Sequence, residues 1–260
     1  MRKFTINVFS NNKQLANQCD VYLVSVELPF DAMLKIASKS SLSESVFVQE
    51  TTDCFSCRIF SPKQEMTSCT HATLAASYVH SKKLSYANKP IKFQEKPLTY
   101  NANGNNIVLS IAGLEMNKVN VDIDDKYLLP IFENAKKWTA QTSSGYKRLM
   151  LELTNLQDVM AISPCSLVKI DKAIPEVESY FIYCSLSSDC NEFYGRMFAP
   201  KLGIDEDPVN GNSCIALFSL QRINNPDVAK ITFVQNQGAE FTIEEKRGEL
   251  FLSANCFEND

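Results

Sequence analysis

Arg58-Ile59-Phe60-Ser61-Pro62-Lys63 returns almost unchanged as Arg196-Met197-Phe198-Ala199-Pro200-Lys201. Each copy ends a stretch of alternating polar and apolar residues, which is typical of a half-buried strand. A short acidic loop follows each copy and leads into a helix of small residues, which begins near His71 in the first half and near Asn212 in the second. Because the same order of strand, loop and helix occurs twice, the sequence predicts a duplicated fold.

The duplication divides the 260 residues into two similar domains. We expect residues 1–115 to form the first domain and residues 116–260 the second, with a polar connector at 114–119 and a last strand that can pair with the first domain. An approximate twofold axis between the halves would bring the two helix starts together. Free N–H groups and the helix dipole favour an anion there, so we expect function at this seam.

Apolar periodicity predicts the helices and strands. The predicted strands cover residues 4–9, 21–26, 45–48, 54–60, 91–94, 107–111, 149–153, 180–186, 192–198, 231–235, 241–244 and 250–254. The predicted helices cover residues 30–38, 72–82, 128–138, 156–161 and 212–222. The helix at 72–82 is apolar on nearly every side, so we expect a sheet to wrap it. The pattern indicates an α+β fold with mostly antiparallel sheets.

The composition narrows the functional class. Hydrophobic residues make up 45% and charged residues 22% of the chain, which are ordinary values for a globular protein. The net charge of -4 comes from 26 basic and 30 acidic residues without a long block of either sign, which argues against nucleic-acid binding. The chain has no apolar run of roughly 20 residues and begins with an alternating, strand-like segment. We therefore expect a cytoplasmic protein without a membrane partner.

Cofactor and metal motifs are missing from the sequence. The first glycine is Gly104, and no Gly-rich phosphate loop follows it, so we expect no nucleotide cofactor. His71 and His80 are the only histidines, which argues against a histidine-based zinc or iron site. Nine dispersed cysteines are expected to be reduced thiols. Cys54 and Cys57 would point to opposite faces of a strand, so they cannot clasp one metal ion.

Proton-transfer groups occur in three polar stretches. These are Ser41–Phe47 with Glu44, Glu65–Thr73 with Cys69 and His71, and Glu206–Ser213 with Asp207. Carboxylates and imidazoles at the ends of strands and helices can act as acids and bases. Each also has a structural alternative, because Glu44 could flank a strand in water, Asp207 could cap a helix, and His71 could be a hydrogen-bonded structural imidazole.

Four segments resemble the signatures of the phenazine-biosynthesis PhzF-like isomerase family, whose fold is shared with diaminopimelate epimerase. They are Ser43-Glu44-Ser45, Arg58–Glu65, Cys69-Thr70-His71-Ala72-Thr73 and Glu206–Asn212. The family has Ser-Glu-Thr, Arg-x-Phe-Thr-Pro-x-x-Glu, Cys-Gly-His-Ala-Thr and Glu-Asp-Pro-Ala-Thr-Gly-Ser at these places. All four occur in the family's order over almost the whole chain. The resemblance implies two domains, each a curved sheet or barrel around a central helix, with the site in the cleft between them.

The resemblance also implies a reaction and its residues. Glu44 would be the general acid/base that moves a proton between carbons of a small carboxylate-bearing substrate, with His71 and Asp207 assisting. The substrate-binding residues at the two helix starts would be Cys69, Thr70, Asn210, Gly211 and Asn212. No cofactor and no metal are required, and the family implies a homodimer. A carboxylate base suits this chemistry if partial burial raises its pKa towards working pH.

The sequence departs from the family pattern in three places. Thr70 replaces a glycine, Asn210-Gly211-Asn212 replaces Thr-Gly-Ser, and Ala16-Asn17-Gln18 replaces Gly-Asn-Pro. These changes keep open a second hypothesis, a catalytically silent relative that binds a small acid or a protein partner. A third hypothesis is a two-thiol epimerase that acts through Cys69. Asn210 stands where the second thiol would be, and this argues against the third hypothesis.

Overall fold

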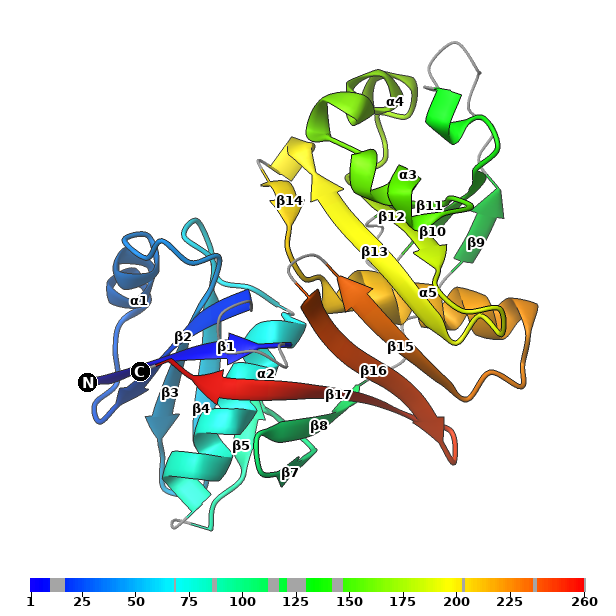
Figure 1. The fold of residues 1–260 in the computed structure, drawn as a ribbon. Helices are drawn as coiled ribbons and strands as arrows, with labels where there is room; N and C mark the ends of the chain where they lie inside the picture. The colour runs from blue at the N-terminus through cyan, green and yellow to red at the C-terminus, as the bar shows by residue number, and fades with distance from the viewer. Residues whose placement is uncertain are drawn as a thin grey trace. The chain divides into compact units, whose positions relative to one another are not determined.

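The repeated stretch ends one strand in each of two β-sheets (Figure 1). The computed structural model describes residues 1–9, 17–67, 69–85, 88–111, 117–120, 130–141, 147–202, 204–235 and 238–259. The chain divides into two units, Met1–Ile111 with Phe251–Asp260, and Ala112–Leu250. The boundary expected near residue 115 lies in residues 112–116, outside the described part of the chain.

The first unit contains a mixed sheet. Its elements are β1 (Arg2–Val8), β2 (Asn17–Val24), α1 (Phe30–Ala37), β3 (Ser45–Glu50), β4 (Phe55–Phe60), α2 (Thr70–Val79), the π-helix His80–Leu84, β5 (Ile91–Phe93), β6 (Lys96–Pro97), β7 (Tyr100–Asn103), β8 (Asn106–Ile111) and most of β17 (Glu249–Glu258). The strands pair in the order β17, β1, β2, β3, β4, β5 and β6. The last strand of the chain therefore pairs with the first.

The central element of the first unit is α2. All its residues from His71 to Val79 are buried, and it packs against β1, β2, β3 and β8 (Figure 1). Small side chains such as Ala72, Ala75 and Ala76 let the sheet approach the helix backbone closely. The prediction that a sheet surrounds this apolar helix is confirmed.

The second unit has a sheet of its own. Its elements are β9 (Asn117–Asn120), a 3-10 turn (Pro130–Phe132), β10 (Lys136–Gln141), β11 (Lys147–Glu152), α3 (Leu156–Ala161), a 3-10 turn (Pro164–Leu167), α4 (Val168–Ala173), β12 (Ser179–Ser185), β13 (Glu192–Ala199), a 3-10 turn (Pro200–Leu202), β14 (Ile204–Asp207), α5 (Gly211–Asn224), β15 (Lys230–Gln235) and β16 (Ala239–Lys246). Strands β9, β10, β11, β12, β13, β15 and β16 pair in that order, and β14 pairs with the end of β13.

The two sheets share one pairing pattern. From β1 to β6 the successive pairs are antiparallel, parallel, antiparallel, parallel and antiparallel. From β10 through β11, β12, β13 and β15 to β16 the pairs follow the same order. Strands β4 and β13, which carry the repeated stretch, hold equivalent places, and a helix follows each. The predicted duplication and the α+β class are therefore confirmed.

The arginine of each repeat fixes the acidic loop that follows it. Arg58 makes two hydrogen bonds of 2.7 Å to the Glu65 carboxylate, and Arg196 makes bonds of 2.8 and 2.7 Å to Glu206. Arg58 also lies over the ring of Phe60, as Arg196 lies over that of Phe198. Bidentate pairs of this kind set the loop's direction. The repeat therefore guides the chain from strand to helix in both units.

One predicted element is wrong. The helix expected over residues 128–138 is replaced by the turn Pro130–Phe132 and by strand β10, while residues 128–129 lie outside the described part. Ile131, Phe132, Ala135 and Trp138 follow a helical spacing, but strand pairing with β9 and β11 decides the conformation from Lys136 onwards. The polar connector expected at 114–119 likewise ends in a strand, β9. Helix α4 was not predicted.

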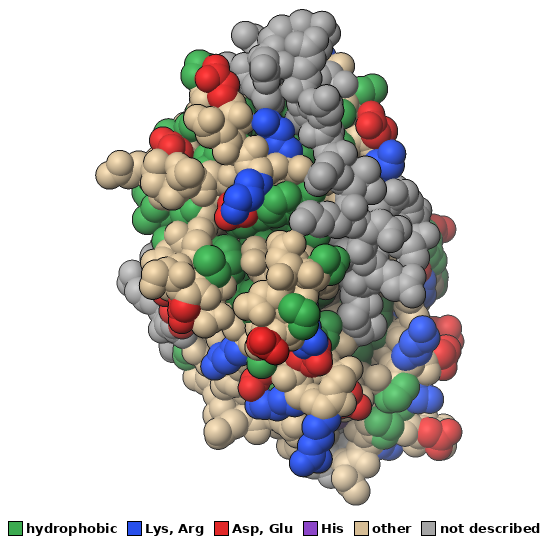
Figure 2. Space-filling model, turned by 90° about the vertical axis from the view of Figure 1, so that its right-hand side faces the viewer, with side chains coloured by type: hydrophobic (Ala, Val, Ile, Leu, Met, Phe, Trp, Pro, Cys, Tyr) green, Lys and Arg blue, Asp and Glu red, His purple; other side chains and the backbone are tan. Residues whose placement is uncertain are grey.

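The described surface gives two further observations. No helix among the described residues is long and apolar enough to cross a bilayer. On the face shown in Figure 2, acidic and basic side chains are interspersed, and neither sign gathers into one patch.

Candidate active site

Glu44 is held at the entrance to strand β3. Strand β3 begins at Ser45, which lies opposite Asp20 in the parallel pairing with β2. The thiol of Cys19, also in β2, donates to the backbone carbonyl of Glu44 at 3.7 Å. The sheet therefore fixes the backbone that carries the Glu44 carboxylate.

Cys69 and His71 lie at the start of α2. Cys69 is the N-cap residue, with an extended backbone, and its carbonyl accepts hydrogen bonds from the N–H and the hydroxyl of Thr73 at 3.0 and 2.8 Å. His71 follows in the first turn and is buried. This fixed first turn directs the thiol and the imidazole towards the entrance of β3.

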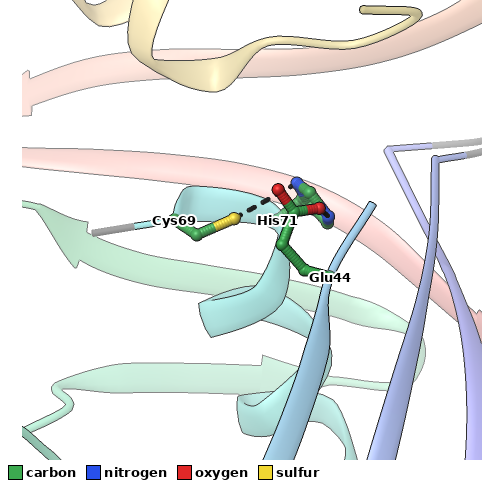
Figure 3. Close-up of side chains that lie close together, drawn as sticks. All are labelled: Glu44, Cys69 and His71. Carbon is green, nitrogen blue, oxygen red and sulfur yellow. Dashed lines mark hydrogen bonds and ion pairs between the residues drawn. The ribbon is translucent and has the colours of Figure 1, made fainter. Parts of the chain in front are cut away.

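Glu44, His71 and Cys69 form one chain of side chains (Figure 3). His71 Nε2 lies 2.8 Å from Glu44 Oε2, and His71 Nδ1 lies 3.4 Å from Cys69 Sγ. The side chains of His71 and Glu44 are 9% and 14% exposed. Nε2 and Oε2 are both buried and face one another in this ion pair. We call these three residues the Glu44–His71–Cys69 cluster.

Within the cluster, the pKa values of Glu44 and His71 shift in opposite directions, and both shifts favour the charged forms. Burial alone would raise the pKa of Glu44, but the charge of His71 and hydrogen bonds from His71 and Ser43 lower this pKa below its usual 4.5. Burial alone would lower the pKa of His71, but Cys69 and Glu44 raise it well above 6.5. The pKa of Glu44 is therefore not raised towards working pH, because the ion pair with His71 outweighs desolvation.

The same three residues offer ligand atoms that could hold a metal ion. The three ligand atoms all lie within 4.8 Å of one another. Thiolate, imidazole and carboxylate are the ligands of zinc. However, the thiol contacts Nδ1 and the carboxylate contacts Nε2, on opposite sides of the ring. One ion bound to either ring nitrogen would require the group on the other side to move, so the geometry fits a hydrogen-bonded chain better.

The other predicted residues gather at the start of α5, in the second unit. Asn210 is the N-cap of α5, and its Oδ1 accepts from the N–H and the hydroxyl of Ser213, both at 2.8 Å. Asn210 Nδ2 donates to Asp207 Oδ2 at 3.0 Å, and Asp207 Oδ1 accepts from the N–H of Val209 at 3.2 Å. Asp207 and Asn210 therefore order the turn into α5.

Each remaining predicted residue also lies in a first helical turn. Gly211 and Asn212 are the first two residues of α5, and Thr70 is the first residue of α2. Gly211 is buried, whereas Asn212 and Thr70 are partly exposed. In the segment Ala16-Asn17-Gln18, Ala16 lies outside the described residues. Asn17 and Gln18 begin β2, and Gln18 donates to the side chain of Asn7 at 3.0 Å.

Sequence reasoning missed one residue beside this second group. Arg148, in β11, is buried, and its guanidinium donates to Ser179 at 2.8 Å and to Asn210 Oδ1 at 3.4 Å. A buried arginine needs such partners. A signal was present in the sequence, because Arg148 precedes the apolar run Leu149-Met150-Leu151 of a predicted strand.

The second histidine has a structural role. His80 Nδ1 lies 2.6 Å from the hydroxyl of Tyr100, and Nε2 lies 2.9 Å from the carbonyl of Lys89. Burial lowers the pKa of His80. With both ring nitrogens engaged, His80 is a hydrogen-bonded core histidine, and it provides a natural control for His71.

Comparisons with known proteins agree with this architecture. The family model described as phenazine biosynthesis-like protein matches residues 6–255. The uncharacterized isomerase PA3578 of Pseudomonas aeruginosa is 25% identical over 225 residues, which cover 84% of this chain and 81% of that protein. A PhzF family protein of Enterococcus faecalis superposes with a TM-score of 0.78 at 24% identity, over 99% of this chain and 96% of that one. A hydroxyproline epimerase of Agrobacterium vitis shares the fold at a TM-score of 0.61 and 11% identity, over 99% and 90%.

Proposed function

Because the chain belongs to the phenazine biosynthesis-like protein family, we propose that it is an isomerase that moves a proton on a small carboxylate-bearing metabolite. The relative in Pseudomonas aeruginosa is named an isomerase, and the fold recurs in an epimerase. The observation that carries the proposal is the contact of 2.8 Å between the Glu44 carboxylate and the His71 imidazole.

In this proposal, Glu44 is the base. Its lowered pKa keeps the carboxylate ionised at neutral pH, while the raised pKa of His71 keeps the imidazole protonated. The ionised carboxylate can accept a proton, and the protonated imidazole beside it can donate one. Glu44 would take a proton from one carbon of the substrate and return it to another, and His71 would balance the charges as the proton moves.

The substrate carboxylate would be held by backbone N–H groups at a helix start. The starts of α2 and α5 carry the positive end of the helix dipole. Helix starts favour anions for this reason. Cys69, Thr70, Asn210, Gly211 and Asn212 would bind the substrate, and Asp207 would orient its groups, as the family resemblance implies. Because these steps use protein groups alone, the proposed reaction needs no cofactor.

Deuterium incorporation tests the proposal. The protein is incubated in D2O with a panel of unsaturated and amino carboxylates, and exchange at carbon is followed by NMR. We expect wild type to incorporate deuterium and Glu44→Gln to lose at least about 100-fold in rate, the usual contribution of a general base. Glu50→Gln is the matched control, because Glu50 lies in the same strand and pairs with Lys89 at 2.8 Å.

Two outcomes would contradict the proposal. If Glu44→Gln exchanges deuterium as fast as wild type, Glu44 is not the base. If wild type binds an acid from the panel but exchanges no deuterium on any member, the protein is a silent binder, as the departures at Thr70 and Asn212 allow.

A further inference from the structure

Cys69 differs from the other eight cysteines. Six of them, like Cys69 itself, are buried: Cys19, Cys54, Cys57, Cys184, Cys214 and Cys256. Burial raises the pKa of Cys19, Cys57, Cys184, Cys214 and Cys256. Cys165 and Cys190 are exposed, and the sulfur of Cys54 contacts the hydroxyl of Thr51. Among the described contacts, only Cys69 places its sulfur beside an imidazole nitrogen. Only this cysteine therefore has a neighbouring base.

The order of groups in the cluster is the order needed to activate a thiol. Glu44 lies at Nε2 of His71, and this contact orients the ring so that Nδ1 faces Cys69 Sγ at 3.4 Å. An activated nucleophile is recognised by such a base, which is in turn oriented by a third group. In the ion pair with Glu44, His71 is an imidazolium, and its Nδ1 presents positive charge to the sulfur of Cys69.

The position of Cys69 at the start of α2 also favours an activated thiol. Cys69 is the N-cap of a helix of 10 residues. The positive end of the helix dipole stabilises a thiolate at this position. The imidazolium and the helix start are independent contributions, and both favour the charged form of sulfur.

We propose that Cys69 is a nucleophilic thiolate, paired with the imidazolium of His71, that adds to the electrophilic carbon of α,β-unsaturated carbonyl compounds. The sulfur, paired as a thiolate with the His71 imidazolium, forms a bond to the β-carbon. The electrons of the C=C bond move to the α-carbon, which then takes up a proton from His71 or water. The addition needs no oxidant or reductant. It does not depend on the proposed isomerase reaction.

The proposal is tested with N-ethylmaleimide, an α,β-unsaturated carbonyl compound. The full chain, in its native state, is treated at pH 6 with less than one equivalent of reagent, and the modified cysteine is identified by peptide mass spectrometry. We expect Cys69 to react at least about 10-fold faster than Cys165 and Cys190, although these two are exposed, because an ordinary thiol is less than about 1% ionised at this pH.

The pH dependence gives a second measurement. Ordinary thiols react about 10-fold faster for each pH unit between pH 6 and 8, because the thiolate fraction rises by that factor. The rate at Cys69 should change less than about 2-fold over this range, because the His71 imidazolium lies beside the sulfur. The exposed cysteines serve as internal references in the same sample.

Variants separate activation from simple folding effects. His71→Gln should reduce the rate at Cys69 to that of Cys165 or below, and should restore its ordinary pH dependence. His80→Gln replaces the structural histidine and should leave the rate at Cys69 unchanged. Each variant is first checked for native circular dichroism and a cooperative melt.

Two results would contradict the proposal that Cys69 is a nucleophilic thiolate. If Cys165 and Cys190 are labelled while Cys69 is not, or if the rate at Cys69 rises with pH as at the exposed cysteines, the proposal is overturned. Labelling requires no substrate and no turnover. Its failure therefore leaves the isomerase proposal standing, and undiminished deuterium exchange in Glu44→Gln, which contradicts the isomerase proposal, leaves this one standing.

Discussion

At the residue scale, the proposed function depends on the charges of Glu44 and His71. The lowered pKa of Glu44 contributes stability that is present above its usual value of 4.5 and is lost as the pH falls through the folded value. The raised pKa of His71 contributes stability that is complete below 6.5 and is lost as the pH rises through the folded value. The ion pair is therefore intact at neutral pH.

The pH profile of deuterium exchange should follow this pair. We expect wild-type activity to fall at low pH as Glu44 is protonated, and to fall at high pH, above 6.5, as His71 loses its proton. In His71→Gln the carboxylate stays buried without its cation, so the acid limb should move to higher pH and the alkaline limb should disappear. The rate is measured from pH 4 to 10, and His80→Gln should keep the wild-type profile. An acid limb that does not move would contradict the role of His71.

Asn210 allows a stability test at the same scale. Its side chain caps α5 through two bonds of 2.8 Å to Ser213. Asn210→Ala should lower the free energy of unfolding by about 1–2 kcal/mol, because the first turn of α5 loses its acceptor. Asn210→Ser, whose hydroxyl can also cap, should lose less than about half of that. Equal losses in urea denaturation would indicate that the cap does not set the effect.

The sequence predicted which residues form the site better than it predicted their protonation states. The signature motifs identify Glu44, Cys69, His71 and Asp207, and the structure brings the first three together. The direction of the Glu44 pKa shift could not be predicted, because it depends on whether desolvation or a cation 2.8 Å away is larger. That balance is set by the fold and not by the local sequence.

At the scale of elements, the two arginines of the repeat have different surroundings. Arg58 is 38% exposed and pairs with Glu65, whereas Arg196 is 11% exposed and pairs with Glu206. Arg196 also donates to the carbonyls of the α3 C-terminus at Val159, Met160 and Ile162, at 3.1, 3.0 and 2.7 Å. Arg196 therefore caps the C-terminus of α3 and also holds the acidic loop through Glu206.

This difference predicts unequal losses of stability. Arg196→Met should lower the free energy of unfolding by about 3–5 kcal/mol, because it leaves Glu206 and the α3 carbonyls without their charged donor. Arg58→Met should cost about 1 kcal/mol or less, since exposed ion pairs are screened by water. Both are measured by urea denaturation with the wild-type chain as reference. If the two losses are equal, the cap on α3 contributes nothing measurable.

Element prediction succeeded where local pattern and packing agree. The apolar run of α2 and the alternation of β4 each determine their own structure. The pattern around residues 131–138 suits a helix, but pairing with the strands on either side in the sequence, Asn117–Asn120 and Lys147–Glu152, makes Lys136–Gln141 a strand. The apolar pattern of one segment does not show which strands it will pair with.

At the scale of the whole molecule, the last strand, β17, completes the sheet of the first unit. The N- and C-termini lie side by side on this unit (Figure 1). Strand β17 pairs antiparallel with β1, placing Ile6 opposite Glu258 and Val8 opposite Cys256, and it also pairs with β8. Its residues Leu252, Ala254 and Cys256 are buried. Residues 1–111 therefore contain a sheet that is incomplete without residues 251–259.

We expect this closure to control folding of the first unit. A fragment of residues 1–111 should remain unfolded, because β1 and β8 would expose unpaired edges and the core would lose the β17 side chains. A permuted chain, with residues 251–260 joined to Met1 by about eight Gly and Ser residues, should fold. About four strand residues, or roughly 14 Å, separate the two ends, and this linker can span them.

The comparison is made by urea denaturation and by the dispersion of amide signals in NMR spectra. The permuted chain should unfold in one cooperative transition, and the plain fragment should show none. A third chain, in which Leu252, Ala254 and Cys256 of the permuted fragment are replaced by serine, keeps the length but removes the buried side chains, and it should behave like the plain fragment. Cooperative unfolding of residues 1–111 alone would contradict the prediction, since the first unit would then be complete without its last strand.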